Sequence, residues 1–125
     1  MPLNKSSTYA LIGASSNPEK YGNIILHDLH DNGYHILPVN PQENSIDGIA
    51  CYKNLTEIPE KIDVVIFVVP PQIAREVLEE VVELGIKQVR FQPWSESEEA
   101  RALCEEKGLQ YSFEKCIMVE RRLNA

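Results

Sequence analysis

The chain has 125 residues, 43% of them hydrophobic and 25% charged, a composition that excludes fibrous and disordered folds. Its 12 Lys and Arg side chains against 19 Asp and Glu give a net charge of −7, and no stretch gathers basic residues, so we expect no nucleic-acid partner. The length predicts one domain, residues 1–125, without room for a second catalytic module.

Short β-rich runs alternate with helical patterns, which is typical of a parallel sheet covered by helices. The first half predicts strands at residues 9–12 and 35–39 and a helix at 22–32 between them. A turn at 47–48, a short edge pairing at 51–52 and a helical turn at 56–61 follow. The first helix is amphipathic, because Ile24, Ile25 and Leu29 share one of its faces.

The second half predicts strands at residues 63–69, 88–91 and 109–113, with helices at 72–84 and 95–108 between them. The strand at 63–69 is apolar on both faces, which indicates a central position between two layers of helices. Ser95 and Glu98 have the spacing of a capping box and open the last helix. The sequence therefore predicts an α/β fold, a doubly wound, mostly parallel sheet of about five strands with helices on both faces.

Location and redox state also follow from the sequence. The longest apolar run, Val64–Val69, has six residues where a membrane span needs about 20, so we expect no membrane partner. Met1–Ser7 lacks the apolar core of a secretion signal, so we expect a cytoplasmic protein. Cys51, Cys104 and Cys116 are odd in number and form no C-x-x-C pair, which predicts reduced thiols rather than a disulfide framework or a zinc site.

The junction between the first strand and the first helix is built from small and polar residues. Gly13, Ala14, Ser15 and Ser16 follow the strand directly, where backbone N–H groups and the helix dipole favour an anion such as a phosphate. Lys20 is the nearest cation that could offset the net negative charge. The spacing is not the dinucleotide pattern G-x-G-x-x-G, and a polar surface loop without a ligand is the alternative.

Two further strand ends are candidate parts of a ligand site. Asn40 ends the second strand, where an NAD site places Asp or Glu on the ribose hydroxyls, so the uncharged residue favours a phosphorylated ribose or a nucleotide other than NAD. The alternative is an Asn40–Pro41 turn that needs no ligand. Val69, Pro70 and Pro71 predict a stiff apolar wall for an adenine or an aliphatic arm, or simply a strand terminator.

Catalytic and metal sites are less well indicated. His27, His30 and Asp31 have the spacing of metal ligands on a helix, but they lie on an ordinary polar face with no fourth ligand nearby in the sequence. The nucleophile motif G-x-S-x-G does not occur. We therefore assign no metal ligand and no catalytic residue.

Taken in order, these segments resemble the stand-alone CoA-binding domain proteins, which are similar to the nucleotide-binding domain of the succinyl-CoA synthetase alpha subunit. The resemblance extends from about Tyr9 to Glu120. The segments that carry it are Gly13–Pro18 with Gly22, Pro38–Pro41, Ile58–Pro59, Val69–Pro71, Phe91–Gln92, Gly108–Leu109 and Cys116 with Glu120.

The resemblance implies a Rossmann-like fold that binds coenzyme A, or an acyl-CoA, as a small-molecule nucleotide ligand. It places the pyrophosphate near residues 13–16, the adenosine near Asn40 and Pro41, and residues 69–71 along the ligand. The family commonly has a glycine two residues after the position of Gln92, and this chain has Trp94 there. Its ring could stack on the ligand or fill the pocket.

The synthetase's phosphorylated histidine lies in another domain that has no counterpart in this sequence, so ligase activity is not implied. The main hypothesis is binding of coenzyme A or an acyl-CoA without catalysis. One alternative is an enzyme, either a nucleotide-dependent oxidoreductase or an acyl-CoA ligase subunit that requires a partner chain. The other is an interaction protein with an empty site. The sequence does not indicate protein partners.

Overall fold

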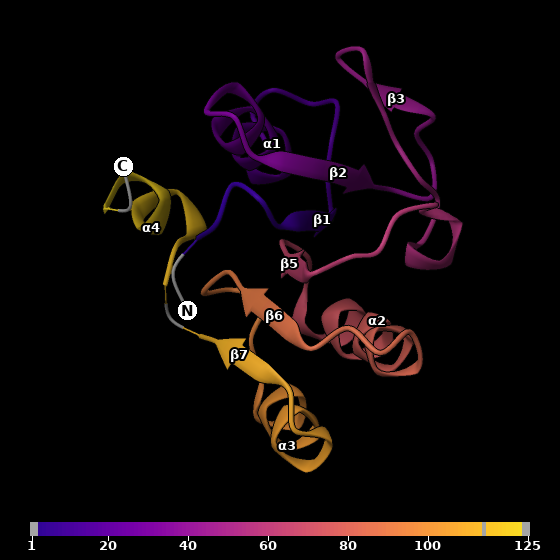
Figure 1. Ribbon diagram of the computed structural model, residues 1–125, viewed down its shortest axis with the longest axis vertical. Coiled ribbons are helices and arrows are strands. Elements are labelled where there is room, and N and C mark those ends of the chain that lie inside the picture. Colours follow the sequence, from indigo (N-terminus) through magenta and orange to yellow (C-terminus); the bar gives the residue numbers. More distant parts are fainter. Residues whose placement is uncertain (1–2, 114, 124–125) are drawn as a thin grey trace.

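A five-stranded sheet forms the centre of the computed structural model, which describes residues 3–113 and 115–123. The predicted domain, 1–125, and the N-terminal segment Met1–Ser7 therefore include positions that lie outside the described residues. All neighbouring strands pair in parallel, in the order β2-β1-β5-β6-β7 (Figure 1). The strands are β1 (Thr8–Ile12), β2 (His35–Val39), β5 (Val64–Phe67), β6 (Gln88–Phe91) and β7 (Gln110–Ser112).

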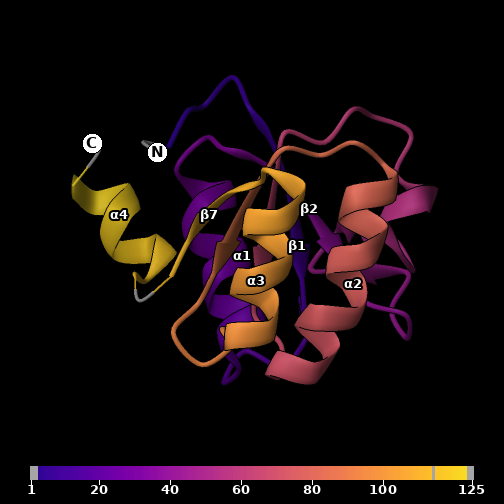
Figure 2. The same ribbon diagram turned by 90° about the horizontal axis from the view of Figure 1, so that it is seen from below.

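Helices cover both faces of this sheet. They are α1 (Tyr21–Asp31), α2 (Pro71–Glu83), α3 (Glu98–Lys107) and α4 (Ile117–Leu123). Figure 1 shows α1 and α4 on one side of the sheet and α2 and α3 on the other, and Figure 2 shows α2 and α3 side by side in front of the strands. The predicted Rossmann-like, doubly wound α/β fold is confirmed.

Alternation along the strands divides the apolar side chains between two cores. In β1, Tyr9 and Leu11 pack toward α1 and α4, whereas Ala10 and Ile12 pack toward α2 and α3. The four residues of β5 are all buried and alternate in the same way. This explains why the central segment is apolar on both faces.

The order of the strands creates a switch point between β1 and β5. The connection from β1 to β2 passes through α1 on one face, and the connection from β5 to β6 passes through α2 on the other. In such sheets the loops after the two central strands diverge, and the crevice between them is where ligands bind. The fold therefore points to the carboxyl ends of β1, β2 and β5.

Several elements differ from the predicted ones. The polar stretch after β2 contains a hairpin of β3 (Ser45–Ile46) and β4 (Ile49–Ala50), with the predicted turn at 47–48 between them. The predicted helical turn at 56–61 is a 3-10 turn, η1 (Leu55–Glu57). The expected edge pairing at 51–52 is present as a bridge between Val39 and Tyr52.

The end of the chain and the start of α3 also differ. Helix α4 was not predicted, because seven residues are too few to show a clear helical period. The N-cap of α3 is Ser97, whose side chain accepts a hydrogen bond from the N–H of Ala100, and not Ser95. Among the described residues no helix combines the length and apolar character that a membrane crossing requires.

Candidate functional site

Close backbone packing fixes the loop that follows β1. Gly13 has φ +99°, and a Cβ at this position would lie 2.4 Å from the carbonyl oxygen of Val68 at the end of β5. At Gly22, in the first turn of α1, a Cβ would lie 2.0 Å from the carbonyl oxygen of Gly13. Both glycines are therefore required by the approach of β1, α1 and β5 at the switch point.

This loop presents unpaired backbone donors. Within the described residues, the N–H groups of Ala14 and Ser15 have no protein acceptor. Helix α1 has no side-chain cap and no acidic residue in its first turn, so none of its own side chains offsets the positive end of its dipole; Glu19, just before the helix, lines the pocket there. The local arrangement favours an anion at the loop.

Ser16 is arranged differently from its neighbours. It is exposed, and its N–H donates to Oε2 of Glu43, 3.0 Å away in the segment after β2. The amide that sequence reasoning assigned to a pyrophosphate is therefore occupied by a carboxylate of the chain itself.

Asn40 ties the end of β2 to the same loop. Its Nδ2 donates to the carbonyl of Ala14 at 2.8 Å, and its Oδ1 accepts from the N–H of Gln42 at 2.8 Å. The second bond makes the Asn-Pro turn that the sequence left open as an alternative. Asn40 therefore positions the loop, and it also borders the two pockets described next.

Two adjoining pockets lie at the carboxyl ends of β1, β2 and β5, and both are bordered by Gly13, Asn40 and Val69. We call the first the loop pocket; its volume is about 400 Å³, and it is lined by Gly13–Ser15, Glu19–Gly22, Asn40, Val68–Pro70 and Trp94. We call the second the apolar pocket; its volume is about 280 Å³, and it is lined by Ile12, Gly13, Val39–Pro41, Lys53–Leu55, Val69, Ile73, Val77 and Glu80.

The structure brings most of the predicted site residues to these pockets. Nine of them line one pocket or both: Gly13, Ala14, Ser15, Lys20, Asn40, Pro41, Val69, Pro70 and Trp94. Ser16, Pro71 and Gln92 line neither pocket.

Gln92 is instead a buried structural residue. Its Oε1 accepts from the N–H of Ile117 at 2.8 Å, and its Nε2 lies 3.5 Å from Sγ of Cys116. The side chain thereby fastens the start of α4 to the end of β6.

An aromatic pair forms one end of the loop pocket. The rings of Tyr21 and Trp94 have centroids 4.8 Å apart and an interplanar angle of 41°, and they are 52% and 42% exposed. The adjacent Ser95 is fully buried, and its Oγ both accepts from the N–H of Val69 and donates to the Val69 carbonyl. The loop that carries Trp94 is therefore anchored to the end of β5.

A buried amide that sequence reasoning missed connects the loop to the β3–β4 hairpin. Asn23 is 5% exposed, and its Nδ2 lies 2.9 Å from the Ser15 carbonyl and 3.2 Å from Oδ2 of Asp47. The same oxygen lies 2.7 Å from Nε2 of His27. These hydrogen bonds from His27 and Asn23 lower the pKa of the Asp47 carboxyl. In the sequence, Asn23 is visible only as a polar residue beside the apolar face of α1, and its position there does not indicate which groups it binds.

The side chains on α1 that have the spacing of metal ligands, His27, His30 and Asp31, contact carboxylates or histidines of the chain itself. His27 pairs with Asp47, and His30 contacts Asp31 at 3.4 Å. Across the described residues, no group of three or more His, Cys, Asp or Glu side chains could hold a metal ion.

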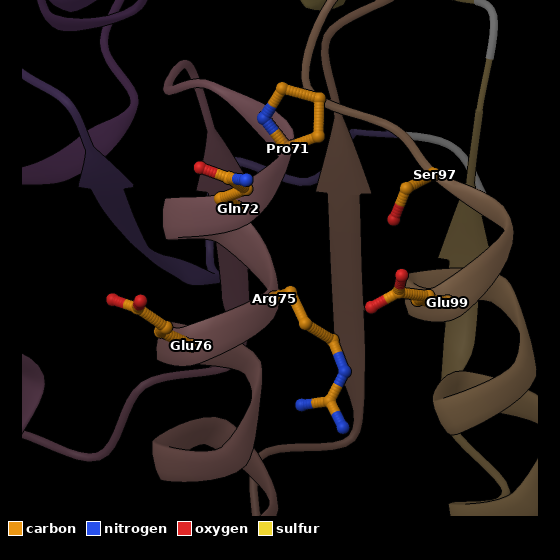
Figure 3. Close-up of a pocket in the computed structure, with 6 residues that line it drawn as sticks. All are labelled: Pro71, Gln72, Arg75, Glu76, Ser97 and Glu99. Carbon is orange, nitrogen blue, oxygen red and sulfur yellow. The ribbon is translucent and has the colours of Figure 1, made fainter.

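A larger groove, of about 460 Å³, lies between α2 and α3 (Figure 3). Arg75 extends into it from α2 and Glu99 from α3, and Glu76 also lines it. The Arg75 guanidinium lies 3.5 Å from Glu79, so the positive charge of the groove is already balanced by carboxylates. This groove is less suited to a phosphate than the loop pocket.

The sequence matches a family described as "CoA binding domain" over residues 7–122. It is 40% identical over 85 residues to the acetate–CoA ligase (ADP-forming) of Methanocaldococcus jannaschii, a match that covers 68% of this chain and 12% of the ligase. It is 30% identical over 117 residues to the uncharacterized protein YneT of Bacillus subtilis, covering 94% of this chain and 87% of YneT.

A solved structure of a conserved hypothetical protein from Pyrococcus furiosus superposes with a TM-score of 0.88 at 52% identity, covering 91% of this chain and 98% of that one. Across the acetate–CoA ligases that it matches, the chain spans only 10% to 20% of their length.

Proposed function

Because the chain belongs to the family of CoA binding domains, we propose that it binds coenzyme A or an acyl-CoA at the carboxyl ends of β1, β2 and β5 and carries out no chemistry on it. The strongest support comes from the backbone N–H groups of Ala14 and Ser15, which have no acceptor among the described residues and lie beside the uncapped start of α1.

The two pockets match the alternation of chemistry along such a ligand. Coenzyme A has an adenine at one end, phosphates in the middle and a long, weakly polar pantetheine arm. The apolar pocket suits the adenine, with Pro41 and Asn40 beside the adenosine. The loop pocket suits the pyrophosphate, with Ala14 and Ser15 as backbone donors and Lys20 as the cation on its rim.

In the proposed arrangement the pantetheine arm follows the pyrophosphate out of the loop pocket. A ligand that enters from the apolar pocket and crosses the loop continues along Val69 and Pro70 toward Tyr21 and Trp94. In this arrangement the Trp94 ring borders the arm and provides an apolar surface for it. Ser16 contributes its backbone only when Glu43 moves aside, and Gln92 acts through the fold and not by contact.

The alternative function is that of a ligase subunit that requires a partner chain. The observation that favours it is the similarity to acetate–CoA ligases, among them a protein named as a subunit alpha. YneT, 87% of which is matched by this chain, shows that a similar domain also occurs outside a full-length ligase.

Calorimetric titration with coenzyme A, acetyl-CoA, NAD and NADP tests the proposal. Coenzyme A and acetyl-CoA are expected to bind, and NAD is not. Ser15→Asp places a carboxylate beside the proposed pyrophosphate and is expected to weaken coenzyme A binding by about tenfold or more. Equal affinity for NAD and coenzyme A would favour the oxidoreductase alternative, and no binding of any of the four would favour an empty site.

A further inference from the structure

The apolar pocket carries one cation on its rim. Lys53 lies in the segment between β4 and η1, is exposed, and lines this pocket together with Asn54 and Leu55. No carboxylate among the described residues pairs with Lys53. None of the lysines that the structure describes forms an ion pair, and Lys53 is the one among them that lines the mostly apolar pocket.

The other polar groups around Lys53 are already engaged. The Asn54 side chain accepts from Oγ1 of Thr56 at 2.6 Å and from the N–H of Glu57 at 3.1 Å. Glu80 is the acidic residue that lines the pocket, and its Oε1 accepts from the N–H of Thr56 at 3.1 Å. The lysine ammonium is therefore the group left available for an anion at this rim.

The adjoining pockets thus present two separate cations. Lys20 lines the loop pocket and Lys53 lines the apolar pocket. A ligand with a single pyrophosphate needs only the first of them. Coenzyme A carries a further phosphate on the 3′-oxygen of the adenosine ribose, next to the adenine, and dephospho-CoA lacks it.

We propose that Lys53 recognises the ribose phosphate of the bound nucleotide, so that the protein distinguishes coenzyme A from dephospho-CoA. This inference rests on the proposed function, since it takes the apolar pocket as the site of the adenosine. The ribose then lies at the junction of the two pockets, near Asn40. From the rim of the apolar pocket, the flexible side chain of Lys53 reaches a phosphate attached to that ribose.

The test compares affinities for coenzyme A and dephospho-CoA by calorimetry in three proteins. The wild type is expected to bind coenzyme A about fivefold more tightly, the upper range for an exposed ion pair. Lys53→Gln is expected to lose this preference while its affinity for dephospho-CoA stays unchanged. Lys61→Gln, which removes the same charge from an exposed lysine outside both pockets, is expected to retain the preference.

The outcomes separate the two claims. If the wild type binds neither nucleotide, the proposed function fails and this inference fails with it. If the wild type binds both equally, or if Lys53→Gln keeps the preference, the role of Lys53 is refuted while the proposed function stands. Lys53→Arg restores the charge and is expected to restore the preference. Because Lys53 is exposed, its variants are expected to melt within about 2 °C of the wild type.

Discussion

Gly22→Ala tests the packing on which the loop pocket depends. The new Cβ would lie 2.0 Å from the Gly13 carbonyl oxygen and 3.0 Å from its carbonyl carbon, both backbone atoms that cannot rotate away. Overpacking of this kind costs about 3 kcal/mol. Alanine gains at most about 1 kcal/mol over glycine in a helix, so the net loss of unfolding free energy is about 2 kcal/mol. For a chain of this size that loss lowers Tm by about 6–10 °C.

Thermal unfolding followed by circular dichroism measures the stability, and calorimetry with coenzyme A measures the site. The Gly22→Ala protein is expected to bind coenzyme A more weakly even at temperatures where it is folded, because the loop must move away from α1. Gly85→Ala is the matched control: Gly85 has φ +74° with nothing within 4 Å of an added Cβ, so backbone strain alone costs about 1–2 kcal/mol and binding is unchanged. A Gly22→Ala protein that melts and binds like the wild type would refute the close approach of α1 to the loop.

Further outcomes are expected for three side chains, Trp94, Glu43 and Cys104. Coenzyme A should quench the fluorescence of Trp94 and Trp94→Gly should weaken binding, whereas a gain of affinity in this variant would mean that the ring blocks the pocket. Glu43→Gln removes the negative charge beside the Ser16 N–H and should tighten coenzyme A binding about twofold to fivefold in calorimetry. Weaker binding would contradict the idea that the Glu43 carboxylate competes with the ligand for this N–H. Burial raises the pKa of Cys104 to about 11 and excludes reagents from its thiol, so alkylation at pH 8 should modify Cys104 last among the three cysteines. The thiol's contribution to stability should be complete below its ordinary pKa of 9.0 and should decline as pH rises toward 11, so the loss of stability over this range should be smaller in Cys104→Ala.

The fold could be predicted because periodicity carries most of its information. The alternation of apolar runs marked all five strands of the sheet and the helices α1, α2 and α3 within a few residues. Short elements were missed: α4 and the β3–β4 hairpin have too few residues for a period, and both are held by tertiary contacts. For α4 these contacts include the two hydrogen bonds between Arg121 and Asp28 of α1.

The candidate site could be predicted where it follows from the ends of strands. Gly13, Asn40 and Val69 follow or end neighbouring strands of a parallel sheet, and the structure places all three on both pockets. Lys53 could not be predicted from the ends of strands, because it follows the β3–β4 hairpin. It lies at the apolar pocket only because the chain after this hairpin returns to the edge of the sheet. The engagement of the Ser16 amide by Glu43 depends on the same segment.

The most direct test of the account is the position of the nucleotide. In a two-dimensional ¹H–¹⁵N spectrum of the labelled protein, titration with coenzyme A is expected to shift the amide signals of Gly13, Ala14 and Ser15 most strongly, with smaller shifts near Lys53. The groove between α2 and α3 (Figure 3) provides the internal comparison, since it is larger and its lining shares no residue with that of the apolar pocket. Shifts centred on Gln72, Arg75 and Glu99, with unchanged signals at residues 13–15, would contradict a phosphate site at the end of β1.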